Sequence, residues 1–273
     1  MAASRIHATA VIAEGASLHP SVSVGAYAVI GPEVVIGEGS EIMAHAVVSG
    51  RTHMGKANRV FTGAVIGMDP QDLKYAGEKS RLEIGDSNTF REFVTCHPGT
   101  GDGGVTRIGD RNLLMVGVHV AHDCRVGNDV VISNSVGLAG HVEIADHVVV
   151  GGITGFHQYV RVGRLAMVGG GLRIVADIPP FCLVDGNPAY VTALNRVGLK
   201  RSELDEATQK RLAAAFRILF RRKLPIQSAV AALKTELGDA PPVAELVSFI
   251  AATKRGITRA LPVRGAKEGA PDE

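Results

Sequence analysis

The stretch IGPEVVIGEGSE, residues 30–41, places an isoleucine followed by a glycine twice, six residues apart. The same frame extends in both directions, so that nearly every sixth residue between 6 and 174 is aliphatic or otherwise apolar. The exceptions are positions 72, 78 and 102. Neither a helical period of 3.6 residues nor the simple alternation of a strand accounts for this spacing.

A six-residue period predicts a parallel β-helix of hexapeptide repeats. Each hexad would make one short strand and one turn, and three hexads would close a triangular coil of about 18 residues. The inward aliphatic residues then stack from coil to coil in one continuous core. Glycine, at 33 residues, is expected to allow tight corners with positive φ, and aromatic residues are only 4% of the chain. Valine, isoleucine and leucine must therefore fill the core.

Two segments interrupt the repeat, residues 68–83 and 97–107. Both are polar and rich in turn-forming residues, and we expect them to project as loops from the rigid prism. Loops on such a scaffold often carry binding residues. A tolerated insertion without function is the alternative interpretation.

The pattern changes after residue 174, which divides the chain into parts. We expect the β-helix over residues 1–178, a transition over 179–193, a small α-helical domain over 194–260 and a disordered tail over 261–273. The last coil of a β-helix needs a cap, and the helical domain would supply it. The predicted fold class is therefore mainly β, a parallel β-helix followed by helices.

The helical domain should hold at least three helices. Residues 202–223 read as an amphipathic helix that begins at the capping pair Ser202 and Asp205. Two further helices are expected at 225–237 and 241–255.

Charge and cysteine content exclude several classes of protein. The 29 lysines and arginines nearly balance 27 acidic residues, which argues against nucleic-acid and membrane-surface partners. Three cysteines without a CxxC pair favour a reducing compartment. The N-terminus lacks the pattern of a secretory signal, and no run of about 18 apolar residues predicts membrane insertion. We expect a cytoplasmic protein.

The period of the prism brings polar residues together. A step of about 18 residues moves one coil along the axis, about 4.8 Å, with the side chain pointing the same way. The resulting columns are His119–Gly137–Gly155, His122–Gly140–Gln158 and Asp123–His141–Tyr159, with His157 beside Gln158. These columns predict one polar patch on the prism.

The patch is compatible with acid–base chemistry. A neutral imidazole at His122 can take a proton from a hydroxyl, and Asp123 can orient its ring. Gly140 has no side chain, so a carbonyl oxygen could approach its backbone N–H. This combination predicts acyl transfer to a hydroxyl. The alternative is a polar surface without function.

A metal site is the competing chemistry. It would need three ligands at about 2.0 Å from one point, and the histidines differ in orientation along the coil. A trimer of such β-helices can bind metal between its subunits, as the γ-class carbonic anhydrases do. Their pair of histidines five residues apart is absent here, however. We expect no metal and keep a γ-class metal enzyme, or a β-helix scaffold without activity, as alternatives.

Seven stretches between residues 70 and 201 carry a resemblance to a known family. They are PQDLKYAGE, RLEIGD, NLLMVGVHVAHDCRVGN, LAGHVEI, GGITGFHQYVRVG, MVGG and VGLKR. The sequence resembles the UDP-N-acetylglucosamine O-acyltransferase family, whose members catalyse the first step of lipid A biosynthesis. The resemblance implies a left-handed coil, a homotrimer with active sites between subunits, a β-hydroxyacyl chain delivered by acyl carrier protein, and no further cofactor. Acylation of a 3-amino UDP-sugar stays open as a variant.

The resemblance also implies roles for individual residues. His122 is similar to the general base, Asp123 to its partner and Gly140 to the oxyanion donor. Gly170 and Met167 match positions that set acyl length, and the open glycine predicts a long chain. The residues similar to those that bind substrates are Gln71, Asp72, Lys74, His119, His141, Gly155, His157, Gln158, Asn195 and Arg201. The resemblance also implies that acyl carrier protein docks on basic surface in the C-terminal region, for which RILFRRK, 217–223, is a candidate. A solvated basic face is the simpler alternative for this stretch.

One stretch departs from the family pattern. The family reads Asn-x-Glu-Gly-Leu-Lys-Arg-Arg where this chain reads NRVGLKRS, residues 195–202. Val197 replaces the glutamate and Ser202 the second arginine, which puts contacts to uracil and diphosphate in doubt. Arg196 offers a charge from another position.

Overall fold

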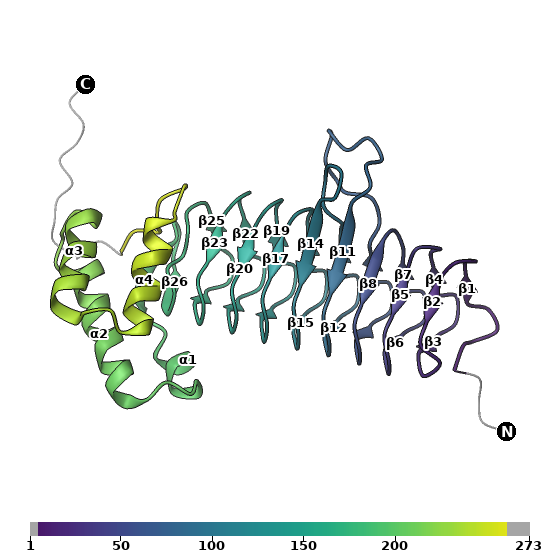
Figure 1. Ribbon diagram of the computed structural model, residues 1–273, viewed down its shortest axis with the longest axis horizontal. Coiled ribbons are helices and arrows are strands. Elements are labelled where there is room, and N and C mark those ends of the chain that lie inside the picture. The colour runs from purple at the N-terminus through teal and green to yellow at the C-terminus, as the bar shows by residue number, and fades with distance from the viewer. Residues whose placement is uncertain (1–4, 261–273) are drawn as a thin grey trace.

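The computed structural model describes residues 5–260 and shows a triangular prism that ends in helices (Figure 1). Three sheets form its faces. All the described strands but the last run parallel, and up to that last strand consecutive strands pass from one sheet to the next. The coil is left-handed. This confirms the fold class expected from the repeat of six.

The first sheet contains β1 (Val11–Ile12), β4 (Val29–Ile30), β7 (Val47–Val48), β10 (Val65–Ile66), β13 (Thr95–Cys96), β16 (His119–Val120), β19 (Gly137–Leu138), β22 (Gly155–Phe156) and β25 (Arg173–Ile174). The second sheet contains β2 (Ser17–Leu18), β5 (Val35–Ile36), β8 (Thr52–Met54), β11 (Arg81–Ile84), β14 (Val105–Ile108), β17 (Arg125–Val126), β20 (Glu143–Ile144) and β23 (Arg161–Val162). The third sheet contains β3 (Ser23–Val24), β6 (Glu41–Ile42), β9 (Arg59–Val60), β12 (Thr89–Phe90), β15 (Leu113–Leu114), β18 (Val131–Ile132), β21 (Val149–Val150), β24 (Met167–Val168), β26 (Cys182–Asp185) and β27 (Tyr190–Leu194).

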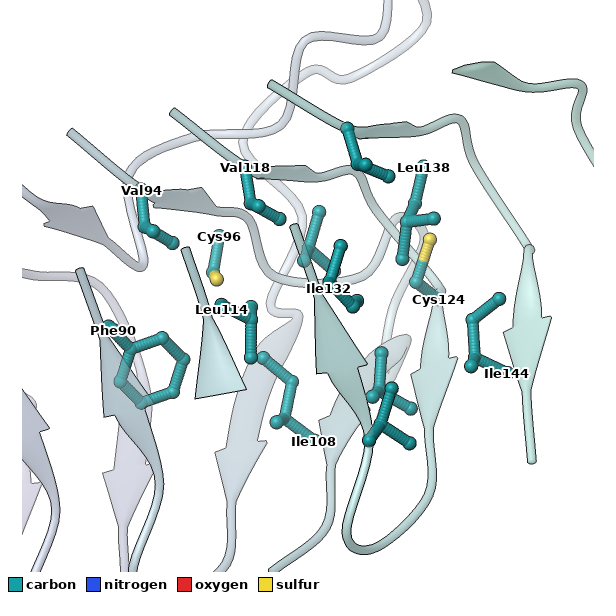
Figure 2. Packing of buried hydrophobic residues seen from close by; sticks show 14 of the residues in the cluster. Phe90, Val94, Cys96, Ile108, Leu114, Val118, Cys124, Ile132, Leu138 and Ile144 are labelled. Carbon is teal, nitrogen blue, oxygen red and sulfur yellow. The ribbon is translucent and has the colours of Figure 1, made fainter. Parts of the chain in front are cut away.

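The inward residue of each strand stacks on its equivalents in neighbouring coils. Phe90, Leu114 and Ile132 follow one another inside the third sheet, and all three are fully buried. Figure 2 shows this stack beside Val94 and Val118 from the adjoining corner. Because each coil repeats the same small aliphatic layer, the core runs without a break along the prism.

Some glycines serve the expected purpose, because Gly39 (φ 69°) and Gly117 (φ 69°) adopt positive φ at corner turns. The second residue of most corner turns adopts positive φ, however, and it is more often another residue, as at Asp123 (φ 59°) and His141 (φ 61°). Many glycines instead follow the inward aliphatic residue, where the next coil lies very close. A Cβ on Gly37 would lie 2.6 Å from the carbonyl oxygen of Gly55. Close approach, rather than positive φ, is what requires glycine there.

The two interruptions of the repeat are loops that pair with each other. They rise beside β11 and β14 (Figure 1). The N–H of Arg81 donates to the carbonyl of Gly104 at 2.9 Å, and the N–H of Gly103 donates to the carbonyl of Lys79 at 3.0 Å. Both loops end slightly earlier than predicted because β11 and β14 begin at residues 81 and 105.

The prism also extends past the predicted boundary at residue 178. Strand β26 pairs in parallel with β24, and β27 then pairs antiparallel with β26. The expected transition at 179–193 therefore belongs largely to the third sheet.

In the part of the chain that the structure describes, four helices follow, α1 (Arg196–Arg201), α2 (Glu206–Arg221), α3 (Ile226–Leu237) and α4 (Pro241–Ala251). Asp205 is the N-cap of α2 and accepts a hydrogen bond from the N–H of Thr208, so the helix predicted to begin at residue 202 begins at 206 instead. Ser202 does not join that cap. It ends α1, a short helix that the sequence analysis missed, and its Oγ donates to the carbonyl of Leu199. The predicted end of the last helix at residue 255 is also wrong, because α4 stops at Ala251.

The helices pack on the last coils through a second apolar cluster. Leu165 and Phe181 of the prism meet Leu199, Leu212 and Leu246 of the helices. Within residues 5–260 there is no helix long and apolar enough to cross a membrane. The predicted disorder of 261–273 lies outside the described residues.

Candidate active site

The polar patch lies at the corner between the first and second sheets. His119 is the first residue of β16 in the first sheet, and His122 and Asp123 form the turn between β16 and β17. A cavity of about 490 Å³ opens beside them. Its lining residues are Gln71, His119, Ala121, His122, Gly137, Leu138, Ala139, Gly140, Gly155, Phe156, His157, Gln158 and Arg173. The register of about one coil per 18 residues therefore assembles most of the predicted patch.

His122 and Asp123 form a hydrogen-bonded pair. His122 Nδ1 lies 2.9 Å from Asp123 Oδ2, and the His122 side chain is 9% exposed. Because the carboxylate accepts, Nδ1 carries the proton in the neutral ring and Nε2 keeps its lone pair. The pair thus has the tautomer that a general base requires.

Asp123 is itself fixed by a residue that the sequence analysis missed. The Thr100 hydroxyl donates to Asp123 Oδ2 at 2.7 Å, and the Thr100 N–H reaches the same oxygen at 3.1 Å. Burial alone would raise the pKa of Asp123, but the hydrogen bonds from Thr100 and His122 and the nearby His141 outweigh it. The pKa of Asp123 therefore lies below its usual value, and the carboxylate stays charged beside the imidazole.

Gly140 lies one coil beyond His122 and makes room for its ring. A Cβ on Gly140 would lie 2.4 Å from His122 Cε1 and 2.5 Å from Nε2. Among the residues that the structure describes, the Gly140 N–H donates no hydrogen bond. A free backbone donor thus lies beside the imidazole, as the proposed oxyanion role requires.

Glycines also form an open floor next to His119. Gly137 and Gly155 follow His119 in the first sheet, and a Cβ on either would meet nothing within 4 Å. The floor can therefore accept a flat or bulky group without a clash.

His119 is held neutral by its surroundings. Its Nδ1 lies 2.8 Å from the Thr95 hydroxyl, and burial, with His97 and His122 nearby, lowers its pKa. His97, which was not singled out from the sequence, donates from Nδ1 to the carbonyls of Met68 and Asp69 at 3.0 and 2.9 Å. It therefore anchors the start of the first projecting loop.

The first projecting loop places one of its three predicted residues against the base. Asp72 Oδ2 lies 3.8 Å from His122 Nε2, and Gln71 lines the cavity. Lys74 is exposed, and only its N–H is engaged, by Asp72.

The other two predicted histidines, His141 and His157, lie at the same corner. His141 Nε2 lies 3.7 Å from Asp123 Oδ2, and its ring stacks on Tyr159 with centroids 4.5 Å apart. His157 and Gln158 are exposed at the far edge of the cavity. Within the described chain, the groups best placed to hold a metal ion are His122, Asp123 and His141.

Four predicted residues lie away from this cavity within one chain. Asn195 is buried, caps α1 by accepting from the N–H of Gly198, and donates to the carbonyl of Leu165. Arg201 is exposed at the end of α1. Met167 and Gly170 belong to β24 and to the corner between the third and first sheets.

Comparisons with known proteins agree with this geometry. The model for the second domain of UDP-N-acetylglucosamine O-acyltransferases matches residues 177–258, and the bacterial transferase hexapeptide model matches residues 15–50 and 106–140. An acyl-[acyl-carrier-protein]–UDP-N-acetylglucosamine O-acyltransferase of Verminephrobacter eiseniae is 49% identical over 94% of this chain and 100% of its own length. The chain belongs to this acyltransferase family.

Other family members show the same relation. The Myxococcus xanthus protein of the same name is 48% identical over 93% of this chain and 99% of its own. The solved UDP-N-acetylglucosamine acyltransferase of Francisella novicida superposes with a TM-score of 0.91 at 34% identity, over 97% of this chain and all of its own. The Moraxella catarrhalis enzyme gives 0.90 at 42% identity, over 93% and 100%.

Proposed function

We propose that this protein transfers a β-hydroxyacyl chain from acyl carrier protein to the 3-hydroxyl of UDP-N-acetylglucosamine, the first step of lipid A biosynthesis. The observation that carries the proposal is the oriented His122–Asp123 pair beside the free N–H of Gly140. Base, orienting group and oxyanion donor meet at one corner, next to a cavity of about 490 Å³ that is large enough for a sugar.

The reaction follows from these positions. His122 Nε2 takes the proton from the sugar hydroxyl, and the oxygen attacks the thioester carbonyl carbon. The negative charge that develops on the carbonyl oxygen is stabilised by the Gly140 N–H. The attack forms the C–O bond of the ester, and collapse of the intermediate restores the carbonyl and breaks the C–S bond. The phosphopantetheine thiolate then takes the proton back from His122, so no cofactor is consumed.

The neighbouring groups have supporting roles in this proposal. Asp123 holds the imidazole and stabilises its charged form during the transfer. His119, His141, His157, Gln158 and Gly155 bind the nucleotide sugar, and Gln71, Asp72 and Lys74 close over the sugar and the acyl-phosphopantetheine arm. The distance of 3.8 Å between Asp72 Oδ2 and His122 Nε2 supports this arrangement.

We further propose a homotrimer with active sites between subunits. The outward positions of the first sheet include Val29, Val47 and Val65, and those of the third sheet include Leu113 and Val149. Apolar side chains in rows on two faces of a prism are typical of a surface that a partner covers. Assembly would also bring Asn195, Arg201 and the acyl-length positions of one chain near the histidines of another.

Acyl carrier protein would dock on the basic stretch of α2. Arg217 is exposed and has no ion-pair partner among the described residues, whereas Arg222 pairs with Glu236. The reducing compartment inferred from the cysteines supports a cytoplasmic enzyme, because Cys96, Cys124 and Cys182 are all free and buried.

A direct assay tests the function. Purified protein is incubated with β-hydroxyacyl-carrier protein and UDP-N-acetylglucosamine, and in parallel with the 3-amino analogue of the sugar. We expect ester formation with the hydroxyl acceptor. Transfer only to the amine would contradict the choice of acceptor, and transfer to neither would contradict the function.

A further inference from the structure

A three-residue cluster at the catalytic corner has the composition of a metal site. His122, Asp123 and His141 each offer a ligand atom, and these atoms all lie within 4.8 Å of one another. We propose that the cluster binds one divalent transition-metal ion, with Zn²⁺ as the natural probe, and that the bound ion switches the active site off. The inhibitory half rests on the proposed function of His122, whereas the binding half does not.

The separations of the ligand atoms suit a small tetrahedral ion. Asp123 Oδ2 lies 2.9 Å from His122 Nδ1 and 3.7 Å from His141 Nε2. Bonds of about 2.0–2.1 Å in a tetrahedron place ligand atoms about 3.3 Å apart, so the two pairs with Asp123 need shifts of about 0.4 Å. The two histidine nitrogens lie within 4.8 Å of each other and would approach by about 1.5 Å at most. Two imidazoles and one carboxylate with an open fourth position form a known type of zinc donor set.

The ligands are held in place and open to solvent. Thr100 fixes the carboxylate through its hydroxyl, and Tyr159 stacks on His141 with an interplanar angle of 7°. The His141 side chain is 36% exposed, which leaves a path for an ion. Groups that orient ligands in this way commonly tune metal affinity.

Binding at Nδ1 would change the tautomer of His122. In the free enzyme the ring proton is on Nδ1, where Asp123 accepts it. When Nδ1 forms a bond to the metal, this proton leaves and the neutral ring carries its proton on Nε2 instead. Nε2 then has no lone pair for the sugar hydroxyl. Occupation of the site therefore removes the base without removing any residue.

The neighbouring corner offers a matched control. His147 occupies the equivalent position one hexad later, with φ 58° against 61° at His141. Its Nδ1 lies 3.9 Å from Asp129, but both oxygens of that carboxylate accept hydrogen bonds from Arg111 at 2.8 Å. Asp129 is therefore already paired with a cationic guanidinium, whereas the donors to Asp123 are the neutral Thr100 and the proposed ligand His122 itself, so His147 should not contribute a ligand.

The test is a Co²⁺ titration of the full-length protein, followed through the visible absorption of four-coordinate cobalt, with Zn²⁺ competition to obtain Kd. The variants are His141→Asn and His147→Asn, because asparagine tolerates positive φ and is a poor zinc ligand. We expect one ion per chain in the wild type and in His147→Asn. His141→Asn should raise Kd at least about tenfold, the lower end of the range found for indirect ligand supports.

Acyl transfer is then measured with and without stoichiometric Zn²⁺, and again after chelator is added. Reversible loss of activity in the wild type and in His147→Asn completes the expected result. No stoichiometric binding, or equal binding in His141→Asn, would overturn the site. Binding that leaves acyl transfer unchanged would overturn the switch and also the assignment of His122 as base. Binding by a protein with no transferase activity would instead contradict the proposed function.

Discussion

Two corners of the prism share one backbone and use it differently. At the aspartate corner, formed by Asp86, Asp110, Asn128 and Asp146, each side chain accepts a hydrogen bond from the previous coil. The N–H of Asp110 donates to Asn128 Oδ1 at 2.8 Å, and the N–H of Asn128 donates to Asp146 Oδ1 at 2.7 Å. This column connects successive coils and stabilises the turn.

At the histidine corner, the corresponding column is His122, Gly140 and Gln158. Glycine stands where the other corner has an acceptor, and the imidazole of His122 fills the space that a side chain would occupy. The corner thereby loses a structural hydrogen bond and gains a buried ring with a free backbone donor beside it. The same turn stabilises the prism where its column consists of aspartate and asparagine, and it makes room for a candidate catalytic histidine where the column contains Gly140.

The largest expected difference follows from truncating each corner in turn. His122→Ala should lower kcat/KM by about 10²–10⁴, the usual contribution of a positioned base, with little change in unfolding temperature. Asn128→Ala should do the reverse, because it leaves the N–H of Asp110 unpaired and costs about 1–3 kcal/mol of stability. Steady-state kinetics and thermal unfolding of both variants test this. More than a tenth of wild-type activity in His122→Ala would rule out its role as base.

A third corner, between the third and first sheets, tests acyl length. Gly170 lies there, and a Cβ on it would lie 3.1 Å from the Gly152 carbonyl oxygen, so a side chain needs only a small adjustment. If the acyl chain lies in a groove along the prism beside Gly170, Gly170→Met would fill part of that groove, and each excluded CH₂ forfeits about 0.8 kcal/mol. Excluding four costs on the order of 3 kcal/mol, over a hundredfold in preference.

Competition between long and medium β-hydroxyacyl donors measures the effect of Gly170→Met. The wild type should prefer the long donor, and the variant should prefer one several carbons shorter while it still turns over. An unaltered preference would show that Gly170 does not line the acyl groove.

Loss of the hydrogen bond from the Thr100 hydroxyl to Asp123 should change kcat/KM less than the loss of His122. Thr100→Val removes the hydroxyl that donates to Asp123 Oδ2, so the pKa of Asp123 should rise and the imidazole should be less well oriented. We expect kcat/KM to fall about tenfold, consistent with the loss of one charge-assisted hydrogen bond. Because the pKa of Asp123 is lower in the folded than in the unfolded protein, its ionised form stabilises the fold at pH values above the unfolded pKa of about 3.9. This stabilisation is lost as the pH falls through the folded pKa. The variant should therefore lose less stability on acidification.

Thr100→Ser keeps the hydroxyl and serves as the control. It should show both the wild-type rate and the wild-type loss of stability on acidification, which a merely structural defect would not do selectively. Equal losses in the serine and valine variants would mean that the hydroxyl does not act on Asp123.

The sequence predicts the prism and most of the histidine corner because the period is constant from coil to coil. Once the period is known, Gly140 follows from His122 by counting, and the structure confirms that register. Thr100 escapes this counting because it lies in an insertion that lengthens its coil, so that Thr95 pairs with His119, 24 residues later. His97 escapes because its partners are backbone carbonyls, which leave no trace in the side-chain pattern.

Asn195 is the opposite case: the sequence motif identifies the residue, but both ends of its side-chain amide already form hydrogen bonds within the chain. Its side chain behaves like the aspartate corner, with both ends bonded to backbone groups. The motif therefore gives the position of the residue but not the availability of its amide. Any contact from this segment to uridine would depend on exposed neighbours such as Val197, which is 60% exposed, and Arg196.

The smallest expected effect comes from restoring the family residues in that segment. Val197→Glu with Ser202→Arg adds an exposed carboxylate and a guanidinium, and it removes the hydrogen bond from Ser202 Oγ to the Leu199 carbonyl. If the segment meets the nucleotide, KM for the UDP-sugar should fall a few-fold with kcat unchanged, since exposed charged contacts contribute about 1 kcal/mol or less. Val197→Gln with Ser202→Gln has similar bulk without charge and should leave KM near the wild-type value. An unchanged or raised KM in the charged variant would mean that this chain binds uridine through other residues, and Arg196→Gln would then be the next substitution to measure.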